Sequence, residues 1–158
     1  MARGLFLLLI FSVSLFGSPV LAQSSTVTFN GTILPSCSLI LGAPGVLVPS
    51  SDGHELSSDG PGGVSGTATV LSTGLGYQLQ VDAPSAFSQA PADGQPETLN
   101  VSYQASGVTI GLVTDVLVPL NLGLGLTSLA IELTARNETG IFPAGTYSAD
   151  VVVRCVAS

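Results

Sequence analysis

The sequence contains very little positive charge. Its basic residues are Arg3, Arg136 and Arg154, and lysine is absent, whereas ten residues are acidic. The residues after position 22 therefore carry a formal charge of −8, from two arginines and ten acids. Because phosphates are bound by clustered Lys and Arg, this composition disfavours binding to nucleic acid or to anionic lipid. We expect the charge to keep the molecules soluble by mutual repulsion.

The chain also lacks the residues of a catalytic or metal site. His54 is the only histidine, and it lies between Asp52 and Glu55 in a polar stretch. A histidine oriented by a carboxylate can act as a general base, but no serine elbow accompanies this one. We therefore interpret His54 as a solvated loop residue and predict no enzymatic activity and no cofactor. Asp52, Glu55 and Asp59 lack the spacing of a calcium loop, so we predict no metal site there.

Only two cysteines are present, Cys37 and Cys155. In an oxidising compartment an even pair is most simply a disulfide, so we predict a bond between them. In the chain-entropy model, a bridge that closes a loop of more than about 100 residues stabilises the fold by about 4–5 kcal/mol. Two free buried thiols are the alternative.

The first residues have the pattern of an export signal. Arg3 precedes an apolar run of about a dozen residues that ends at Phe16. The run leads to Val20-Leu21-Ala22, a small-x-small cleavage motif, and it is too short to span a bilayer. We predict that residues 1–22 are a signal peptide and that residues 23–158 form one domain that is secreted, periplasmic or on the cell surface, without stable membrane insertion. An uncleaved membrane anchor is the alternative.

Apolar and polar residues alternate along much of the remaining chain, which is the pattern of half-buried strands. Two such runs, residues 26–33 and 147–155, lie at the ends of the domain, and several more lie between them. Clusters of Gly, Pro, Ser and Asp separate the runs, and no stretch has a helical period with caps. We predict an all-β, antiparallel β-sandwich of about seven or eight strands. The predicted core face consists of Val27, Phe29, Ile33, Leu79, Val81, Ile131, Leu133, Tyr147, Val151 and Val153.

Other segments of the chain carry weaker signals. Residues 50–63 are polar, acidic and rich in glycine, so we predict an exposed loop. Residues 116–131 carry no charge, but the segment is short and contains Pro119, so we predict a pair of buried strands instead of a membrane span. Val152 interrupts the polar face of the last run, which predicts that this strand is covered on both sides.

The two ends of the domain resemble a known family. Phe29-Asn30-Gly31-Thr32-Ile33 followed by Cys37-Ser38-Leu39 resembles the first strand of chaperone–usher pilins and of spore-coat-U-like secreted proteins. In that strand Phe-x-Gly-x-Ile/Val runs into x-Cys-x-Leu. Residues 145–153 resemble the last strand of the family, which has the pattern Gly-x-Tyr-x-x-x-Val-x-Val. The resemblance implies an incomplete, immunoglobulin-like (pilin-like) sandwich, to which a like subunit or a periplasmic chaperone adds the missing strand.

Two features differ from that family. Only residues 23–25 precede the first run, so either residues 26–34 are themselves the donor strand or the chain does not polymerise in this way. Cys155 also lies close to the end of the sequence, whereas the second cysteine of pilins usually lies mid-domain. If Cys37 ends the first strand and Cys155 ends the last, the bridge forms most easily between parallel strands. This placement favours a closed domain, in which the first and last strands pair with each other.

The sequence thus predicts a non-enzymatic structural or surface protein, similar to a fimbrial or spore-coat module, that associates through strand edges. Its predicted partners are like subunits or a periplasmic chaperone. The residues predicted to form the associating edges are Val27, Phe29, Ile33, Tyr147, Val151 and Val153. The alternative is a secreted binding domain whose acidic loop at residues 50–63 contacts a glycan, calcium or a protein. Asn30, Asn100 and Asn137 match the N-glycosylation pattern, which matters only in a host that glycosylates secreted proteins.

Overall fold

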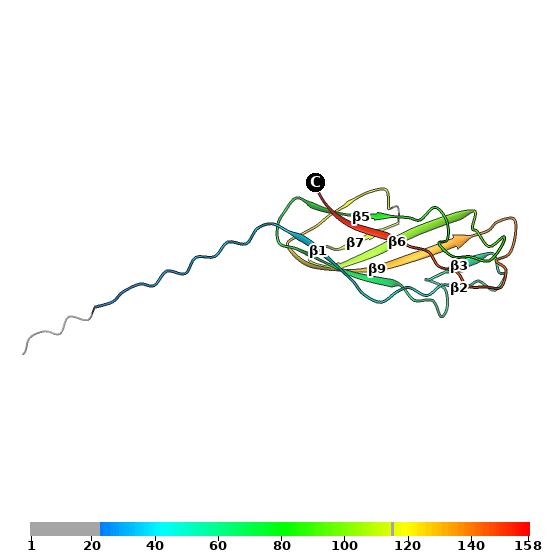
Figure 1. Cartoon of the computed structure of the whole chain (residues 1–158), viewed down its shortest axis with the longest axis horizontal. Helices are drawn as coiled ribbons and strands as arrows, with labels where there is room; N and C mark the ends of the chain where they lie inside the picture. Colours follow the sequence, from blue (N-terminus) through cyan, green and yellow to red (C-terminus); the bar gives the residue numbers. More distant parts are fainter. Residues whose placement is uncertain (1–22, 115) are drawn as a thin grey trace, which may run out of the picture. The chain divides into compact units, whose positions relative to one another are not determined.

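The computed structural model describes residues 23–114 and 116–158, so the predicted signal peptide lies outside the described residues. The chain divides into two units, residues 1–31 and 32–158, and the strands all lie in the second unit (Figure 1). Neither residues 23–114 nor residues 116–158 include a helix that could cross a lipid bilayer. The described strands are β1 (Cys37–Leu41), β2 (Val48–Pro49), β3 (Glu55–Ser57), β4 (Gly66–Ser72), β5 (Tyr77–Asp82), β6 (Thr98–Gly107), β7 (Gly111–Val113), β8 (Leu120–Asn121), β9 (Gly125–Arg136) and β10 (Val152–Ala157).

The strands form two antiparallel sheets. In the larger sheet, β9 pairs with β6 along one side, and with β4 and then β3 along the other. β1 extends this sheet beyond β4, β2 extends it beyond β3, and β7 extends it beyond β6. The smaller sheet has the order β10-β5-β8. The all-β, antiparallel prediction is confirmed, although the described residues form ten strands, three more than the lower predicted number.

Residues of both sheets contribute to one apolar core. Val70 and Tyr103 of the larger sheet and Leu79 and Val81 of the smaller sheet are almost completely buried. Side chains alternate across each strand, so Val101, Tyr103 and Ala105 of β6 are buried while the residues between them are more exposed. The core prediction is confirmed for Leu79, Val81 and Leu133, which are buried. Four further predicted residues are partly buried and pack against the core: Ile131, Tyr147, Val151 and Val153.

The Tyr103 hydroxyl is buried without a hydrogen-bond partner in the described part of the chain. Burying such a group costs desolvation free energy that no hydrogen bond offsets. Replacing Tyr103 with Phe should therefore leave the free energy of unfolding unchanged or raise it by about 1 kcal/mol in urea titrations. Tyr147 is the matched control, because its hydroxyl donates to the Pro143 carbonyl, and Tyr147→Phe should lower the free energy of unfolding by about 1 kcal/mol. A loss above about 1 kcal/mol in Tyr103→Phe would show that this hydroxyl has a partner.

The predicted first strand, over residues 26–33, is wrong. These residues belong to no strand, and the side chains placed in the core face are exposed: Val27 by 72%, Phe29 by 91% and Ile33 by 83%. The first strand instead begins at Cys37, which pairs with Ser72 at the end of β4. Because β4 ends there, the larger sheet offers residues 26–34 no strand with which to continue a ladder.

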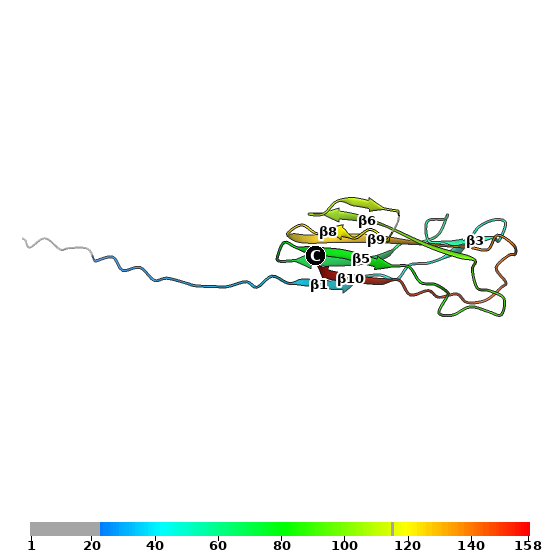
Figure 2. The ribbon, with the colours of Figure 1, turned by 90° about the horizontal axis from the view of Figure 1, so that it is seen from above.

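The predicted closed domain is also wrong. Cys37 begins β1 instead of ending a strand, and residues 26–34 form no ladder with the last strand. β1 and β10 lie next to each other and run in opposite directions (Figure 2). A disulfide that joins the start of one strand to the later part of another suits this antiparallel arrangement, so the bridge does not require the first and last strands to pair.

The structure corrects three further predictions. Residues 50–63 are not a continuous exposed loop, because β3 crosses them and pairs with the end of β9, which buries Leu56. Residues 116–131 do not form two buried strands: β8 has two residues, and Val118 and Leu124 are exposed. Val152 is 48% exposed, so the last strand is covered on one side only.

Candidate functional site

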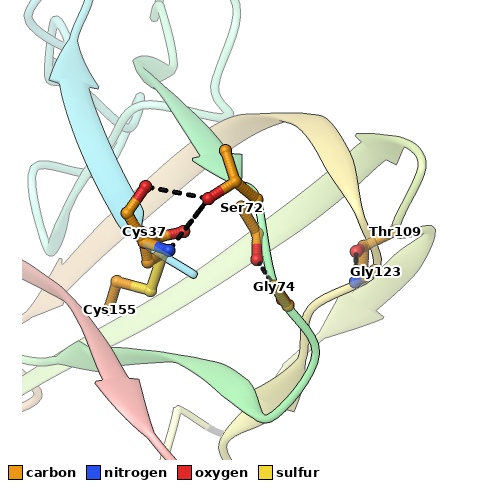
Figure 3. Close-up of a disulfide and its surroundings, with 8 residues drawn as sticks. Cys37, Ser72, Gly74, Thr109, Gly123 and Cys155 are labelled. Carbon is orange, nitrogen blue, oxygen red and sulfur yellow. Dashed lines mark hydrogen bonds between the residues drawn. A yellow bond between two sulfur atoms is a disulfide. The ribbon is translucent and has the colours of Figure 1, made fainter. Parts of the chain in front are cut away.

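The site begins with two strand edges that one disulfide holds together. β1 ends the larger sheet and β10 ends the smaller one. The predicted bond between Cys37 and Cys155 is present, with 6.2 Å between their Cα atoms (Figure 3). Within the described residues no ladder joins β1 to β10. Unpaired edges of this kind leave backbone N–H and C=O groups available to a further strand.

A groove of about 990 Å³ continues from these edges, beginning at Leu41, the last residue of β1, and at Val153 near the start of β10. One wall is the chain that follows β1, residues 41–47, and the other is the chain that leads into β10, residues 142–151. Leu56, Ile131 and Leu133 line it between these walls, and they belong to the core-facing sides of β3 and β9. The groove is therefore long, largely apolar and bordered by two stretches of backbone, which is the form of a site for an extended peptide.

Each wall is held by its outer neighbour in the described structure. The first wall is bound to β4, since the Gly42 N–H donates to the Thr67 carbonyl (2.8 Å) and the Thr67 N–H donates to the Ala43 carbonyl (2.9 Å). The second wall is bound to the chain after β5, since the Ser148 N–H donates to the Gln89 carbonyl (2.9 Å). These bonds fix the walls from outside and hold the groove open between them.

An aromatic cluster forms the end of the groove that is remote from the disulfide. Phe87, Phe142 and Tyr147 contact one another edge to face, with ring centroids 5.2 to 6.1 Å apart. The Tyr147 hydroxyl donates to the Pro143 carbonyl, and burial raises the pKa of Tyr147. The hydroxyl therefore stays protonated at neutral pH, and its bond keeps the second wall bent around this end.

The structure brings together half of the predicted edge residues. Tyr147, Val151 and Val153 line the groove, whereas Val27, Phe29 and Ile33 lie outside all strands and are exposed. The sequence prediction missed the groove residues Leu47, Leu56 and Phe142. A single apolar residue between polar neighbours, such as Leu56, gives no periodic signal, and Phe142 belongs to a segment with Pro and Gly, residues 142–145, that the sequence predicts to be a turn.

Several polar side chains of the acidic loop proposed as an alternative ligand site already have partners, within the loop and at the end of β9. The Asp52 carboxylate accepts hydrogen bonds from the Ser50 hydroxyl (2.6 Å) and the His54 N–H (3.3 Å), which lower the pKa of Asp52. Glu55 forms an ion pair with Arg136 (2.7 Å), and Nδ1 of His54 donates to backbone carbonyls of the loop after β9. The described residues contain no group of three side chains arranged to hold a metal ion.

The groove and the exposed residues 26–34 are therefore the features that bear most directly on function. A comparison with protein-family models finds no match for the chain, and a comparison with curated proteins finds none either.

Proposed function

We propose that this protein is a secreted, non-enzymatic structural or surface module that associates when a further β-strand is added in the groove between residues 41–47 and 142–151, the continuations of β1 and β10. The supporting observation is a groove lined mostly by apolar residues, where the chain continues from two strands at sheet edges, in a protein that also carries an exposed strand-like segment, residues 26–34. The added strand comes from a like subunit or, before assembly, from a periplasmic chaperone. The arrangement fits the incomplete, immunoglobulin-like sandwich implied by the resemblance to chaperone–usher pilins and spore-coat-U-like proteins.

The chemistry of residues 26–34 fits the groove. In an extended chain, Val27, Phe29 and Ile33 point to one side, with Gly31 between them. Nine residues extend about 30 Å and offer a backbone donor or acceptor at every position. Burying a Val, Phe or Ile side chain contributes about 1.5–3 kcal/mol each, and the polar residues between them stay in water. An exposed segment with this alternation is stabilised most when it becomes a strand on another surface, because its apolar side chains are then buried.

Export supports the same proposal. A subunit of an extracellular assembly folds outside the reducing cytosol, where disulfides form and persist. The bond between Cys37 and Cys155 suits such an oxidising compartment. The high acidity of the chain keeps unassembled copies apart until a specific contact outweighs their repulsion.

The experiment that tests the proposal is the self-association of the chain from Gln23 onward, measured by sedimentation velocity. We expect the wild-type chain to form oligomers and Phe29→Asp to weaken this association by about 100-fold, because the groove would have to bury a charge. Thr28→Asp is the matched control, since it adds the same charge to the opposite face of the segment, and it should associate like the wild type. A wild-type chain that stays monomeric at about 1 mM, or equal behaviour of the two variants, would contradict the proposal.

A further inference from the structure

The chain between residues 26–34 and β1 is short and held in place. Only Pro35 and Ser36 separate Leu34 from Cys37. Thr73, in the turn after β4, binds both sides of this connection: its N–H donates to the Ser36 carbonyl (2.9 Å), and its hydroxyl donates to the Leu34 carbonyl (3.1 Å). Three residue steps span at most about 11 Å. A protein that takes up residues 26–34 as a strand must therefore lie against the part of the domain that carries Cys37.

Three turns meet at this part of the domain, which we call the bridge end and define as residues 34–37, 71–76, 107–110, 122–126 and 155–158. The strand register places them together, because Cys37 pairs with Ser72, and Ser72 also pairs with Gly125. The turn between β6 and β7 joins them through Gly107, which pairs with Thr127 of β9. Figure 3 shows Cys37, Gly74, Thr109 and Gly123 in this region, around the disulfide.

The backbone of the bridge end is closely packed. Gly107 has a φ of +108°, and a Cβ at this position would lie 2.5 Å from the Leu126 carbonyl oxygen, so only glycine fits here. The Gly123 N–H donates to the buried Thr109 hydroxyl (2.8 Å), which ties the turn before β9 to the turn between β6 and β7. The bridge end is thus one surface formed by fixed turns.

The side chains of this surface are uncharged and mostly apolar. No residue of the bridge end is Asp, Glu, Lys, Arg or His, although the chain after residue 22 has a formal charge of −8. Leu75 and Ile110 are 75% and 82% exposed. The other exposed apolar side chains of the bridge end are Leu34, Leu71, Val108, Leu124 and Leu126. A cluster of exposed apolar side chains on a small acidic domain is typical of an interaction surface.

We propose that the bridge end is a second contact surface between copies of this chain, formed when residues 26–34 of one copy occupy the groove of the next. The inference rests on the proposed strand addition, because the short, anchored connection is what brings the second copy against the bridge end. The occupant is a second copy because the same chain carries both the segment and a groove of matching chemistry.

The direction of the added strand determines which part of the second copy makes this contact. Because β1 and β10 run in opposite directions, a strand between their continuations is antiparallel to one of them and parallel to the other, and our proposal takes the direction antiparallel to β10. Because β10 runs toward the disulfide, the C-terminal end of the added strand leaves the groove at the aromatic cluster. The bridge end of one copy then meets Phe142 and the exposed Ile141 of the next, which gives a head-to-tail contact that repeats without closing.

Two exposed positions of the bridge end test the inference. In the double variant Leu75→Asp, Ile110→Asp, we expect self-association of the chain from Gln23 onward to weaken at least about tenfold in sedimentation velocity, because the contact would bury two acids. A synthetic peptide of residues 26–34 reports on the groove alone when every acceptor chain also carries Phe29→Asp, which removes competition from the chain's own segment. In that background the peptide should bind the double variant within about twofold of its affinity for the otherwise wild-type chain. Val118→Asp is the matched control, since Val118 is 63% exposed and lies outside the bridge end, and it should change neither measurement.

Self-association and peptide binding together distinguish failure of the bridge-end contact from failure of strand addition. Self-association of the double variant at wild-type strength, with the peptide still bound, would overturn the bridge-end contact and leave strand addition in place. A peptide that binds none of the three chains would overturn the proposed strand addition and, with it, this inference. A loss of peptide binding in the double variant alone would show that the substitutions act through the groove, which also contradicts a separate contact surface.

Discussion

Replacing both Cys37 and Cys155 with alanine should lower the free energy of unfolding by about 4–5 kcal/mol. The bridge joins residues 118 positions apart, so its loss frees a very long loop in the unfolded chain. It is also the covalent link between β1 and β10, which share no ladder in the described residues. A loss of this size is comparable to the whole stability of a small domain, so a large fraction of the variant should be unfolded at 37 °C.

Urea titrations of the oxidised wild type and of the double variant, followed by circular dichroism, measure this difference. Wild-type protein that is reduced and alkylated is the control, because it lacks the bridge but keeps both side-chain positions occupied, and it should be destabilised similarly. Native protein should contain no free thiol by mass spectrometry. A change below about 1 kcal/mol would mean that the ends of β1 and β10 are held by packing alone.

The alternation of apolar and polar residues predicted buried positions correctly where a strand pairs with other strands of the same chain. Leu79 and Val81 alternate with polar residues and are buried, because β5 pairs with β10 on one side and β8 on the other. The same alternation at Val27 and Phe29 predicted a strand that the structure does not contain. Periodicity reports which face of a strand would be buried, but it carries no information about whether a pairing edge is present in the same chain.

Of the two walls of the groove, only the one that leads into β10 was predictable from the sequence, because only that wall has alternating apolar residues. Val151 and Val153 belong to an alternating run, so their common side could be read from the sequence. The opposite wall, residues 41–47, is rich in Gly and Pro and has no alternation. It becomes a wall because Gly42 and Ala43 exchange hydrogen bonds with Thr67 of β4, a pairing that depends on the tertiary fold.

The position of Cys37 shows how one wrong strand changes a functional conclusion. Placed at the end of a strand, Cys37 favoured a closed domain; at the start of β1, it is compatible with antiparallel edges and an open groove. The short strands β2, β3 and β7 were missed because two or three residues are too few to show a period. β3 pairs with the end of β9, β2 pairs with β3, and β7 pairs with β6, so only the folded chain defines their positions.

A peptide with the sequence of residues 26–34 should bind the domain with micromolar affinity and stabilise it. The acceptor is the chain from Gln23 onward with Phe29→Asp, whose own segment no longer competes for the groove. At a free peptide concentration 100 times Kd, the free energy of unfolding should rise by about 2.7 kcal/mol, because the peptide binds the folded state alone. Calorimetry and thermal denaturation measure both quantities, and a peptide that carries Phe29→Asp is the control that should bind at least about 100-fold more weakly.

Amide hydrogen exchange of this acceptor, with and without the wild-type peptide, tests the central claim most directly. If the peptide becomes a strand between the two walls of the groove, exchange should slow in residues 41–47 and 142–151, while β7 at the other edge of the larger sheet stays unchanged. Binding without protection of these two segments, or protection confined to the loop at residues 50–63, would contradict the account.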